Sequence, residues 1–233
     1  MVLEQVLAAL IVTGVFAALA LSLGMVSRSG AVGGFVVGSA VYLSLGWRGF
    51  AVLALFVVGG SVLTRLGYGR KLRVGKAEAR RGRRGARNAL ANCGVAVACA
   101  ALSTLTPYPA AFAAAFVAAL GAAFADTAES EVGQLSRARP RLITTLQRVP
   151  PGTDGAVSLP GTLAGVGAAT MTASAGLALG LVGSGGATIL VALAAFLGTI
   201  ADSIIGARFP RFGNETTNLL CTLVAAVLSL FLT

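Results

Sequence analysis

The chain has 233 residues, of which 56% are hydrophobic and 11% are charged, and its mean hydropathy is +0.87. A soluble domain carries roughly a quarter charged residues, so this composition is that of a protein embedded in a lipid bilayer. The net charge of +10 does not indicate nucleic-acid binding, because only 6% of the residues are aromatic and the basic residues fall between apolar runs. We expect one polytopic domain over 1–233, surrounded by membrane lipids and without a nucleic-acid partner.

The apolar runs predict the number of membrane helices. A helix needs about 20 apolar residues to cross ~30 Å of hydrocarbon. Runs of about this size, separated by charges, Pro or Gly clusters, occupy 2–24, 31–46, 48–66, 88–106, 109–127, 159–182, 184–206 and 215–232. The first run opens with Glu4 and lacks a basic segment, so we expect a retained helix rather than a signal peptide. The predicted fold class is all-α, a polytopic transmembrane bundle of about eight helices.

The basic residues predict the orientation of these helices. Of the 18 Lys and Arg residues, all except Arg48 lie in four segments, 25–30, 65–87, 133–158 and 207–214. Short loops rich in Lys and Arg stay on the cytoplasmic side of the membrane. We therefore expect an inner-membrane protein with both termini outside and with cytoplasmic loops at about 67–87 and 133–158. The first of these loops is polybasic and is expected to contact anionic lipid headgroups.

Carboxylates at the cytoplasmic ends of two predicted helices give the strongest chemical signal. Asp126, Glu129, Ser130 and Gly133 are spaced to share one helical face, and Asp202 lies between two glycines of the seventh helix. A charge at this depth is costly unless it is paired or holds a cation. Carboxylate oxygens favour Mg²⁺, which shares its coordination shell with water and substrate phosphates. Asp126, Glu129 and Asp202 are thus the predicted metal ligands, and an interfacial salt bridge to an arginine is the alternative.

Histidine and cysteine usage narrows the possible chemistry. The chain contains no histidine, which excludes His-based zinc sites, Ser-His-Asp triads and imidazole bases. Cys93 and Cys99 lie in one apolar run and Cys221 in another, without CxxC spacing, so we expect buried, reduced thiols. Any acid–base step is left to Asp, Glu, Lys or water.

The segment that follows the carboxylate helix has the composition of an anion site. It combines arginines, hydroxyls and a Gly-Thr-Asp-Gly turn, and a helix begins again at Ser158 with Pro160 in its first turn. Backbone N–H groups at a helix start, preceded by glycines, bind phosphate. The predicted phosphate-binding residues here are Arg141, Thr144, Thr145, Gly152, Thr153, Ser158, Gly161 and Thr162. An ordinary turn with a helix N-cap is the alternative.

Two sets of polar residues enter the membrane with the spacing of one helical face. Arg84, Asn88 and Asn92 form the first set, and Asn214 and Asn218 form the second at the start of the last helix. Buried amides of this kind either orient a ligand or join helices to one another through hydrogen bonds. Both interpretations are open from the spacing alone.

At these positions the sequence resembles a known membrane family. That family contains animal transmembrane protein 19, bacterial homologues of unknown role and the plastid phytyl-phosphate kinase of tocopherol synthesis. Two departures from its pattern are Ala128, where tryptophan is expected, and Asp154-Gly155-Ala156, where a glycine pair is expected. The similar stretches run in family order through 63–65, 87–94, 125–133, 141–145, 149–153, 157–162, 202–207 and Asn218.

The resemblance implies a kinase that uses Mg²⁺ and a nucleoside triphosphate, CTP in particular, to convert an isoprenyl monophosphate to the diphosphate. Asp126, Glu129 and Asp202 would then be the catalytic and metal-binding residues. The expected phosphate, nucleotide and acceptor contacts are the anion-site residues together with Arg84, Asn88, Asn92, Ser203 and Asn218. Two other functions stay open, a CTP-dependent lipid-phosphate cytidylyltransferase and an ion-coupled transporter or lipid flippase.

Overall fold

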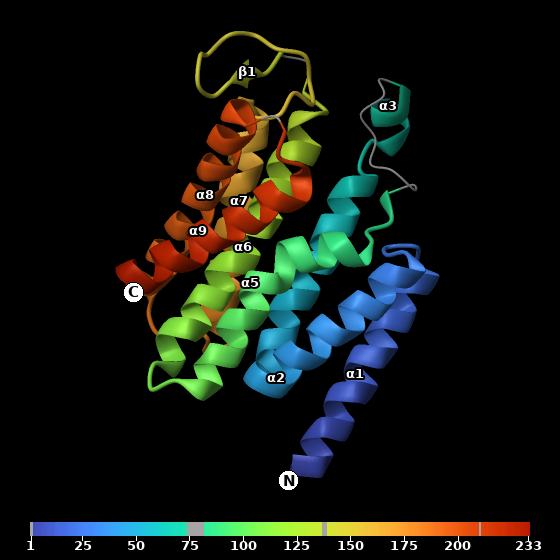
Figure 1. The fold of residues 1–233 in the computed structure, drawn as a ribbon, viewed down its shortest axis with the longest axis vertical. Helices are drawn as coiled ribbons and strands as arrows, with labels where there is room; N and C mark the ends of the chain where they lie inside the picture. Colours follow the sequence, from blue (N-terminus) through green and yellow to red (C-terminus); the bar gives the residue numbers. More distant parts are fainter. Residues whose placement is uncertain (1, 74–81, 137–138, 210) are drawn as a thin grey trace.

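The computed structural model describes residues 2–73, 82–136, 139–209 and 211–233, and helices dominate this part of the chain. The two strands, β1 (Arg141–Leu142) and β2 (Ala156–Val157), form a short antiparallel pair. The helices are α1 (Val2–Ser22), α2 (Arg28–Arg65), α3 (Tyr68–Arg73), α5 (Ala86–Leu105), α6 (Pro109–Gly133), α7 (Leu159–Ala178), α8 (Gly185–Arg208) and α9 (Asn214–Leu232). The all-α, polytopic fold class is therefore confirmed (Figure 1).

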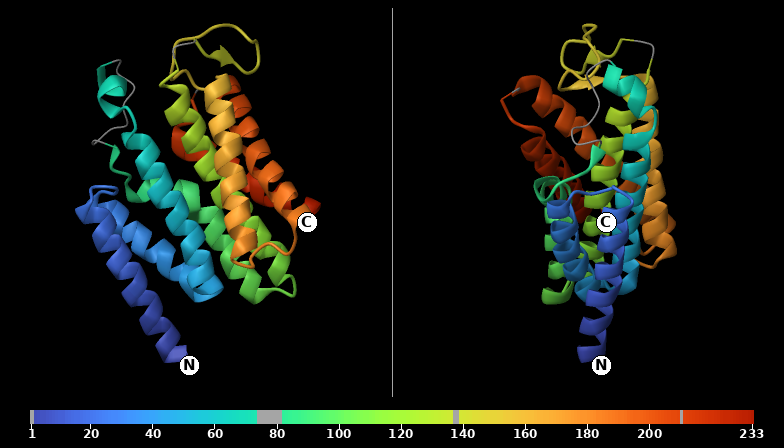
Figure 2. Two further views of the ribbon diagram at one scale, coloured as in Figure 1. Left: turned by 180° about the vertical axis from the view of Figure 1, so that it is seen from behind. Right: turned by 90° about the vertical axis from the view of Figure 1, so that its right-hand side faces the viewer.

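The helix count agrees with the sequence once the break in α2 is considered. Six helices of the described part, namely α1, α2, α5, α6, α8 and α9, are long and apolar enough to cross a membrane. Gly46 interrupts α2 with φ 65° and ψ −162°, a backbone conformation that favours glycine, so that α2 folds back as a helical hairpin (Figure 2). The two halves of α2 correspond to the predicted runs 31–46 and 48–66. With α7, the described chain has eight long helical segments.

Helix α6 is the centre of the bundle. It contacts α2, α5, α7, α8 and α9, and every residue from Ala113 to Ala125 is buried. A helix that is apolar on all sides is stable only when neighbours surround it, and its many alanines allow those neighbours to approach closely. Glycines of the adjacent helices also permit close approach of the backbones. A methyl group on Gly198, for example, would lie only 2.7 Å from the backbone oxygen of Cys221. The acidic end of α6 is thereby held at a fixed position.

Helix α1 lies at the edge of the molecule. It packs against α2, and the buried hydroxyls of Thr13 and Ser39 are hydrogen-bonded at 2.9 Å between the two helices. Figures 1 and 2 show α1 and the α2 hairpin on the flank opposite to α8. The large apolar side chains on the outer face of α1, such as Leu3, Ile11 and Val15, are exposed and would face lipid.

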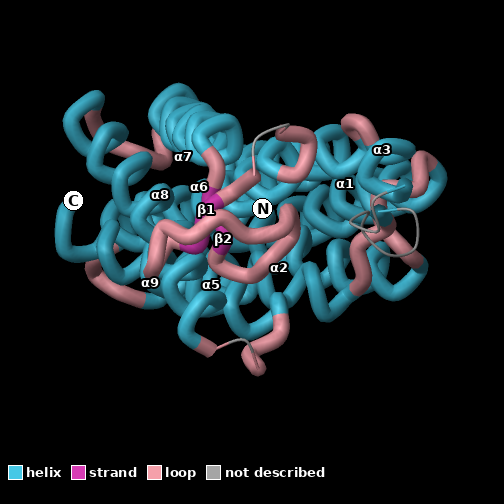
Figure 3. Tube along the Cα trace, turned by 90° about the horizontal axis from the view of Figure 1, so that it is seen from above, coloured by secondary structure: helices cyan, strands magenta, loops and turns pink. Residues whose placement is uncertain are grey.

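The longer loops gather at one end of the bundle. The segment 134–158, with its β1–β2 pair, lies across this end (Figures 1 and 3), and α3 follows α2 at the same end. Both predicted cytoplasmic loops therefore leave the bundle on one side, as the basic residues required. Residues 74–81, at the centre of the polybasic segment expected to contact lipid headgroups, lie outside the described residues.

The assignment of this end to the cytoplasm is a prediction that cysteine labelling can test. The native cysteines are buried, so a membrane-impermeant maleimide should label the parent protein weakly. Gln147 is exposed at the loop end and Thr104 is exposed at the opposite end. In intact cells the Thr104→Cys variant should be labelled and the Gln147→Cys variant should be labelled only after permeabilisation. Labelling of the Gln147→Cys variant in intact cells would reverse the orientation.

Candidate functional site

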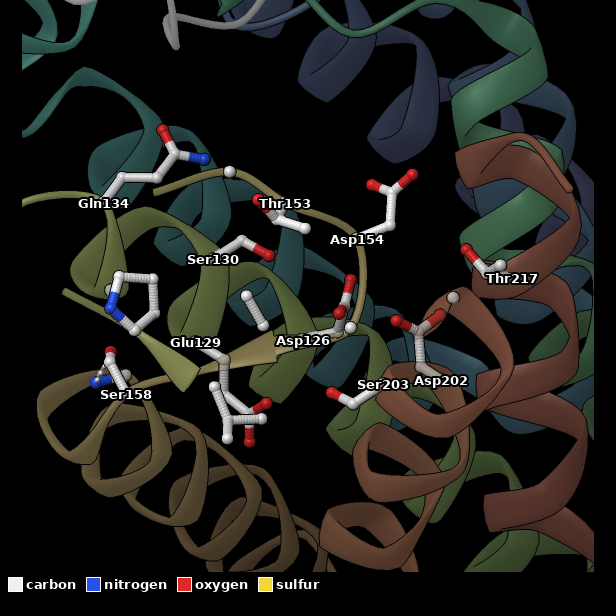
Figure 4. A pocket seen from close by; sticks show the side chains of 18 of the residues that line it. Asp126, Glu129, Ser130, Gln134, Thr153, Asp154, Ser158, Asp202, Ser203 and Thr217 are labelled. Atoms are coloured by element: carbon white, nitrogen blue, oxygen red, sulfur yellow. Dashed lines mark hydrogen bonds between the residues drawn. The ribbon is translucent and has the colours of Figure 1, made fainter. Parts of the chain in front are cut away.

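A polar cavity of about 210 Å³ opens at the loop end of the bundle. It is formed by the end of α6, the start of α7, the ends of α8 and α9 that face the loops, and the segment 151–158, which covers it (Figure 4). Its lining contains ten of the predicted site residues, which are Asp126, Glu129, Gly152, Thr153, Ser158, Gly161, Thr162, Asp202, Ser203 and Asn218. Residues separated by more than 70 positions in sequence thus meet in one cavity.

The charge of this cavity is strongly negative. Asp126, Glu129, Asp154 and Asp202 line it, and no Lys or Arg occurs among the lining residues that the structure describes. Asp126 interacts electrostatically with both Asp202 and Glu129. Figure 4 shows Asp126 on α6 facing Asp202 on α8, with Asp154 above them on the covering loop. The predicted approach of Asp126 and Asp202 is therefore found. No arginine lines the cavity in the described chain, but the charge of Arg84, outside the lining, acts on Asp126.

Asp202 has an oxygen suited to a further ligand. Its Oδ1 atom is buried and has no hydrogen-bond partner within the described chain. A buried carboxylate oxygen left in this state costs free energy, which a cation or a donor from a bound molecule would recover. Thr217 and Ser203 stand on either side of Asp202 in Figure 4 and add hydroxyl groups to the same part of the cavity.

Glu129 is held differently from the two aspartates. Its Oε1 atom accepts a hydrogen bond of 2.9 Å from the hydroxyl of Thr199 on α8. On its other side lies Gly165 of α7, where any side chain would overlap the Glu129 carboxylate. Glu129 therefore occupies a slot between α7 and α8, and part of its hydrogen-bonding capacity is already used.

The carboxylates fit a cation that completes its shell with other ligands. Within the described residues, no three His, Cys, Asp or Glu side chains are grouped closely enough to hold a metal ion by themselves. A preformed site made of Asp126, Glu129 and Asp202 together is therefore not found. The opposed Asp126 and Asp202, with the unpartnered Oδ1 atom, suit Mg²⁺, which is usually bound through one or two carboxylates, waters and substrate phosphates.

Glycines place the covering loop directly against α8. Gly155 has φ +73°, and a side chain there would overlap the backbone oxygen of Ser203 and the backbone of Ala207. A methyl group on Gly206 would in turn lie 3.2 Å from the backbone nitrogen of Gly155. The backbone of the loop can thus contact the backbone of α8 directly, and this contact brings Asp154 over Asp202. At the end of the loop, Ser158 caps α7 by accepting a hydrogen bond of 3.3 Å from the Gly161 N–H.

Three predicted anion-site residues lie outside the cavity. Arg141, Thr144 and Thr145 are exposed in the hairpin region that begins at β1, and none belongs to the cavity lining. The Arg141 guanidinium donates a hydrogen bond of 2.8 Å to the backbone oxygen of Leu146, which fastens the turn. The sequence placed these residues beside Gly152 and Ser158 because it could not show that the turn after β1 is exposed, while β1 itself pairs with β2 of the covering segment. The cavity lining contains only the predicted anion-site residues of the second half of the segment, and their role in anion binding stays a prediction.

The predicted amide positions divide between two places. Asn92 is buried, its carbonyl oxygen accepts a hydrogen bond of 3.3 Å from Asn218, and its amide donates to the Asn88 backbone oxygen at 2.9 Å. This contact joins α5 to α9, which agrees with the helix-joining interpretation, although Asn218 also lines the acidic cavity. Arg84 and Asn88 line a second, apolar cavity and do not line the acidic one.

The sequence analysis missed several cavity residues. Ser130 shares the face of Asp126 and was noted without a role, and Asp154 was recorded only as a departure from the family pattern. Asn214 was noted only for its spacing to Asn218, and Gln134 and Thr217 carry no spacing signal that distinguishes them from ordinary helix-end residues. The other lining residues without a predicted role are Gly133, Pro140, Pro151, Gly155, Ala156, Val157, Gly206 and Phe212, most of which contribute backbone.

Glu131, the third acid of the motif, faces away from the cavity. Its side chain forms a buried ion pair with Lys71 of α3, whose ammonium group also donates to the backbone oxygens of Leu63 and Thr64. The side chains of Lys71 and Glu131 are 1% and 6% exposed. The salt bridge of the motif is thus formed by Glu131, which was not a predicted metal ligand, and by a lysine rather than the expected arginine, and it links the ends of α2, α3 and α6.

Fold and site together define a polytopic membrane protein with an acidic cavity at the loop end of its bundle. The family model described as "Integral membrane protein DUF92" matches residues 11–226, so the chain belongs to the DUF92 family of integral membrane proteins. This is the family of transmembrane protein 19 and phytyl-phosphate kinase that the motifs resemble. No solved structure matches the chain.

Three relatives illustrate the range of the family. The chain is 39% identical over 202 residues to an uncharacterised membrane protein of Synechocystis, a match that covers 84% of this chain and 78% of that protein. It is 36% identical over 187 residues to the chloroplast protein VTE6 of Arabidopsis thaliana, covering 78% of this chain and 56% of VTE6, little more than half of its length. An uncharacterised membrane protein of Methanocaldococcus jannaschii is 31% identical over 208 residues, with 88% and 84% covered.

The Lys71–Glu131 ion pair should be essential for the stability of the fold. Lys71→Met leaves the Glu131 carboxylate buried without a partner, which typically costs roughly 3–5 kcal/mol. Thermal unfolding of the purified protein should show a marked loss of Tm. The double variant Lys71→Met/Glu131→Leu should recover much of that loss, because it removes both charges. An unchanged Tm in Lys71→Met would show that the pair does not support the fold.

Proposed function

We propose that the chain is a membrane-embedded kinase that transfers the γ-phosphoryl group of a nucleoside triphosphate to an isoprenyl monophosphate. The observation that carries this proposal is the pair Asp126 and Asp202, which face one cavity from two helices without a described basic residue in its lining. Such a cavity repels phosphates unless divalent cations neutralise it, and metal-bridged polyphosphates are the usual ligands of this arrangement. The resemblance to phytyl-phosphate kinase supports the choice of an isoprenyl phosphate as acceptor.

The proposed reaction needs no covalent intermediate. A phosphate oxygen of the lipid attacks the γ-phosphorus, the bond from that phosphorus to the β–γ bridging oxygen breaks, and a nucleoside diphosphate leaves. The product is the lipid diphosphate. Catalysis of phosphoryl transfer consists mainly of positioning and charge neutralisation. An ionised phosphate acceptor requires no general base, so the absence of histidine is compatible with this chemistry.

Within this proposal each cavity element has a distinct task. Asp126 and Asp202 would hold Mg²⁺, which when bound neutralises charge on the transferring phosphoryl group. Glu129, fixed by Thr199, keeps the negative potential at the floor of the cavity. The covering loop offers the Gly152–Thr153 backbone, and the start of α7 offers N–H groups near Ser158, for the nucleotide phosphates. The resemblance supports CTP as the proposed donor, and the basic loops support a cytoplasmic active face.

A CTP-dependent cytidylyltransferase is the second enzymatic candidate, because it requires the same metal, nucleotide and lipid phosphate. The transporter candidate is less well supported. Below the acidic cavity, α6 presents only buried apolar residues from Ala113 to Ala125. A transport path along this helix would lack the polar groups that ions need in the membrane interior.

Neutral variants of the two aspartates provide the direct test of the metal assignment. Asp126→Asn or Asp202→Asn should lower kcat by at least about 10²-fold, since charge neutralisation supplies several kcal/mol of the barrier reduction. Their Tm should be unchanged or raised, because each substitution removes one of several like charges that face each other in the cavity. Glu215→Gln, an exposed acid outside the cavity lining, is the matched control. Full activity in both aspartate variants would remove the metal site from the mechanism.

Product analysis distinguishes the two enzymatic candidates. Purified protein should be incubated with Mg²⁺, an isoprenyl monophosphate and CTP labelled either at the α- or at the γ-phosphorus. A kinase transfers the γ label to the lipid and releases CDP. A cytidylyltransferase transfers the α label and releases pyrophosphate. Incorporation of the α label would replace the kinase proposal with the second candidate.

A further inference from the structure

An aromatic pair lies in the connection between α8 and α9, at the loop end of the bundle. The rings of Phe209 and Phe212 are stacked, with centroids 5.4 Å apart and planes inclined by 19°. A turn fixes their positions, since the Phe212 N–H donates to the backbone oxygen of Phe209 at 2.9 Å. Phe209 therefore supports one face of the Phe212 ring, and the opposite face is left for another planar group.

Phe212 is at once exposed and part of the acidic cavity. It is 43% exposed, and it is the one aromatic residue among the described residues that line this cavity. A residue that both lines a cavity and reaches the outer surface lies at the rim of that cavity. The opening of a polar, acidic cavity thus carries a single flat, apolar surface.

Polar groups follow this ring at the start of α9. Asn214 and Thr217 line the same cavity, and Asn214 is exposed. Helix α9 begins after Gly213 without a side-chain cap in the described chain, so its first N–H groups are open to oxygen atoms of a ligand. One short segment therefore supplies an aromatic face, an exposed amide and backbone donors at the same rim.

The rim lies toward the loop end from Asp202, at a distance that a nucleotide can span. Asp202 and the last residue of α8, Arg208, are six positions apart, which corresponds to about 9 Å along the helix axis. A nucleoside triphosphate bound through its terminal phosphates at Asp126 and Asp202 can bridge this length with its remaining phosphate and ribose. The cavity of about 210 Å³ then has to hold only the phosphates and their cations, while the base lies on the exposed rim.

A nucleobase complements this rim better than a hydrocarbon chain does. A base has two flat faces that stack on aromatic rings and a polar edge that bonds to amides. A hydrocarbon chain on Phe212 would border the carboxylates of the cavity and remove water from them, which is costly. The exposed Arg208 and Arg211, each next to one phenylalanine in sequence, add positive charge that attracts a polyphosphate.

We propose that Phe212 stacks on the base of the donor nucleotide, with the Asn214 amide at the edge of the base and the phosphates directed toward Asp126 and Asp202. This inference deepens the proposed function and rests on it for the role of the nucleotide as phosphoryl donor. Phe209 has a positioning role, because it fixes the plane of the Phe212 ring. Stacking is equally strong before and during phosphoryl transfer, so Phe212 should act on the KM for the nucleotide more than on kcat.

Nucleotide binding can be measured without catalysis. The full chain in nanodiscs is given Mg²⁺ and no lipid acceptor, and equilibrium dialysis measures its affinities for labelled CTP and for tripolyphosphate, the probe without a base. Phe212→Ala should weaken CTP binding by about tenfold and leave tripolyphosphate binding unchanged, because the loss of one base–aromatic stack affects only the ligand that has a base. Unchanged CTP binding, or an equal loss for both ligands, would overturn the proposal.

Three further variants separate stacking from apolar contact and from folding. Phe212→Trp keeps an aromatic face and should bind CTP like the parent, whereas Phe212→Leu keeps only apolar volume and should bind CTP like Phe212→Ala. Phe231→Ala removes an exposed ring outside the cavity lining and is the matched control, with the affinity of the parent expected. The Tm of every variant should match that of the parent, since both positions are exposed. Parent-like CTP binding by Phe212→Leu would contradict stacking and indicate an apolar contact instead.

Turnover separates this proposal from the kinase function. In the product assay with labelled CTP, Phe212→Ala should raise the KM for CTP by about tenfold and leave the KM for the isoprenyl monophosphate unchanged. CTP binding that depends on Phe212, without phosphoryl transfer, would reject the kinase function and keep the base site. Phosphoryl transfer with an unchanged KM for CTP in Phe212→Ala would keep the kinase function and reject the base site.

Discussion

The cost of holding carboxylates inside a helical bundle governs the organisation of this protein. The chain places acids at the ends of two helices that cross in an apolar environment, and each must be compensated. Glu131 is compensated by Lys71, and Glu129 is compensated in part by the Thr199 hydroxyl. The aspartates that face the cavity form no ion pair in the described chain, and Asp202, although hydrogen-bonded to Thr217, keeps its buried Oδ1 atom unsatisfied. Uncompensated charge at this one place is what makes the cavity a candidate for a divalent cation.

The packing of the bundle serves this arrangement. Helix α6 can carry Asp126 and Glu129 to a fixed position because its alanine-rich body is enclosed by five neighbours. Small residues at the crossings bring the helices close enough for side chains of α6 and α8 to share a cavity. Glycine at 155 and at 206 then allows the covering loop to lie directly on α8. Close helix packing and the acidic cavity are thus two consequences of the same small-residue composition.

The two cavities differ in the character of their walls. In the smaller cavity the walls are apolar and the polar groups are few. In the other the walls are acidic and rich in hydroxyl and backbone groups, as a metal and a polyphosphate require. Arg84, which lines the apolar cavity, is held by the α1–α2 link and donates a hydrogen bond to Thr127, the residue that follows Asp126 in α6.

The sequence by itself determined the membrane class, the helical segments, the common side of the basic loops and the carboxylate pair, because bilayer thickness, hydropathy and charge cost act locally along the chain. Asp126 and Asp202 could be paired from sequence since both lie at helix ends on the same side. Only the tertiary structure decided which neighbours share a cavity. The fold-back of β1 removed Arg141, Thr144 and Thr145 from the cavity, and the close approach at Gly155 brought in Asp154. The tertiary structure also decided which side of α6 each acid faces, and so paired Glu131 with Lys71. This facing and the apolar cavity beside Arg84 depend on contacts between distant segments, which no local pattern encodes.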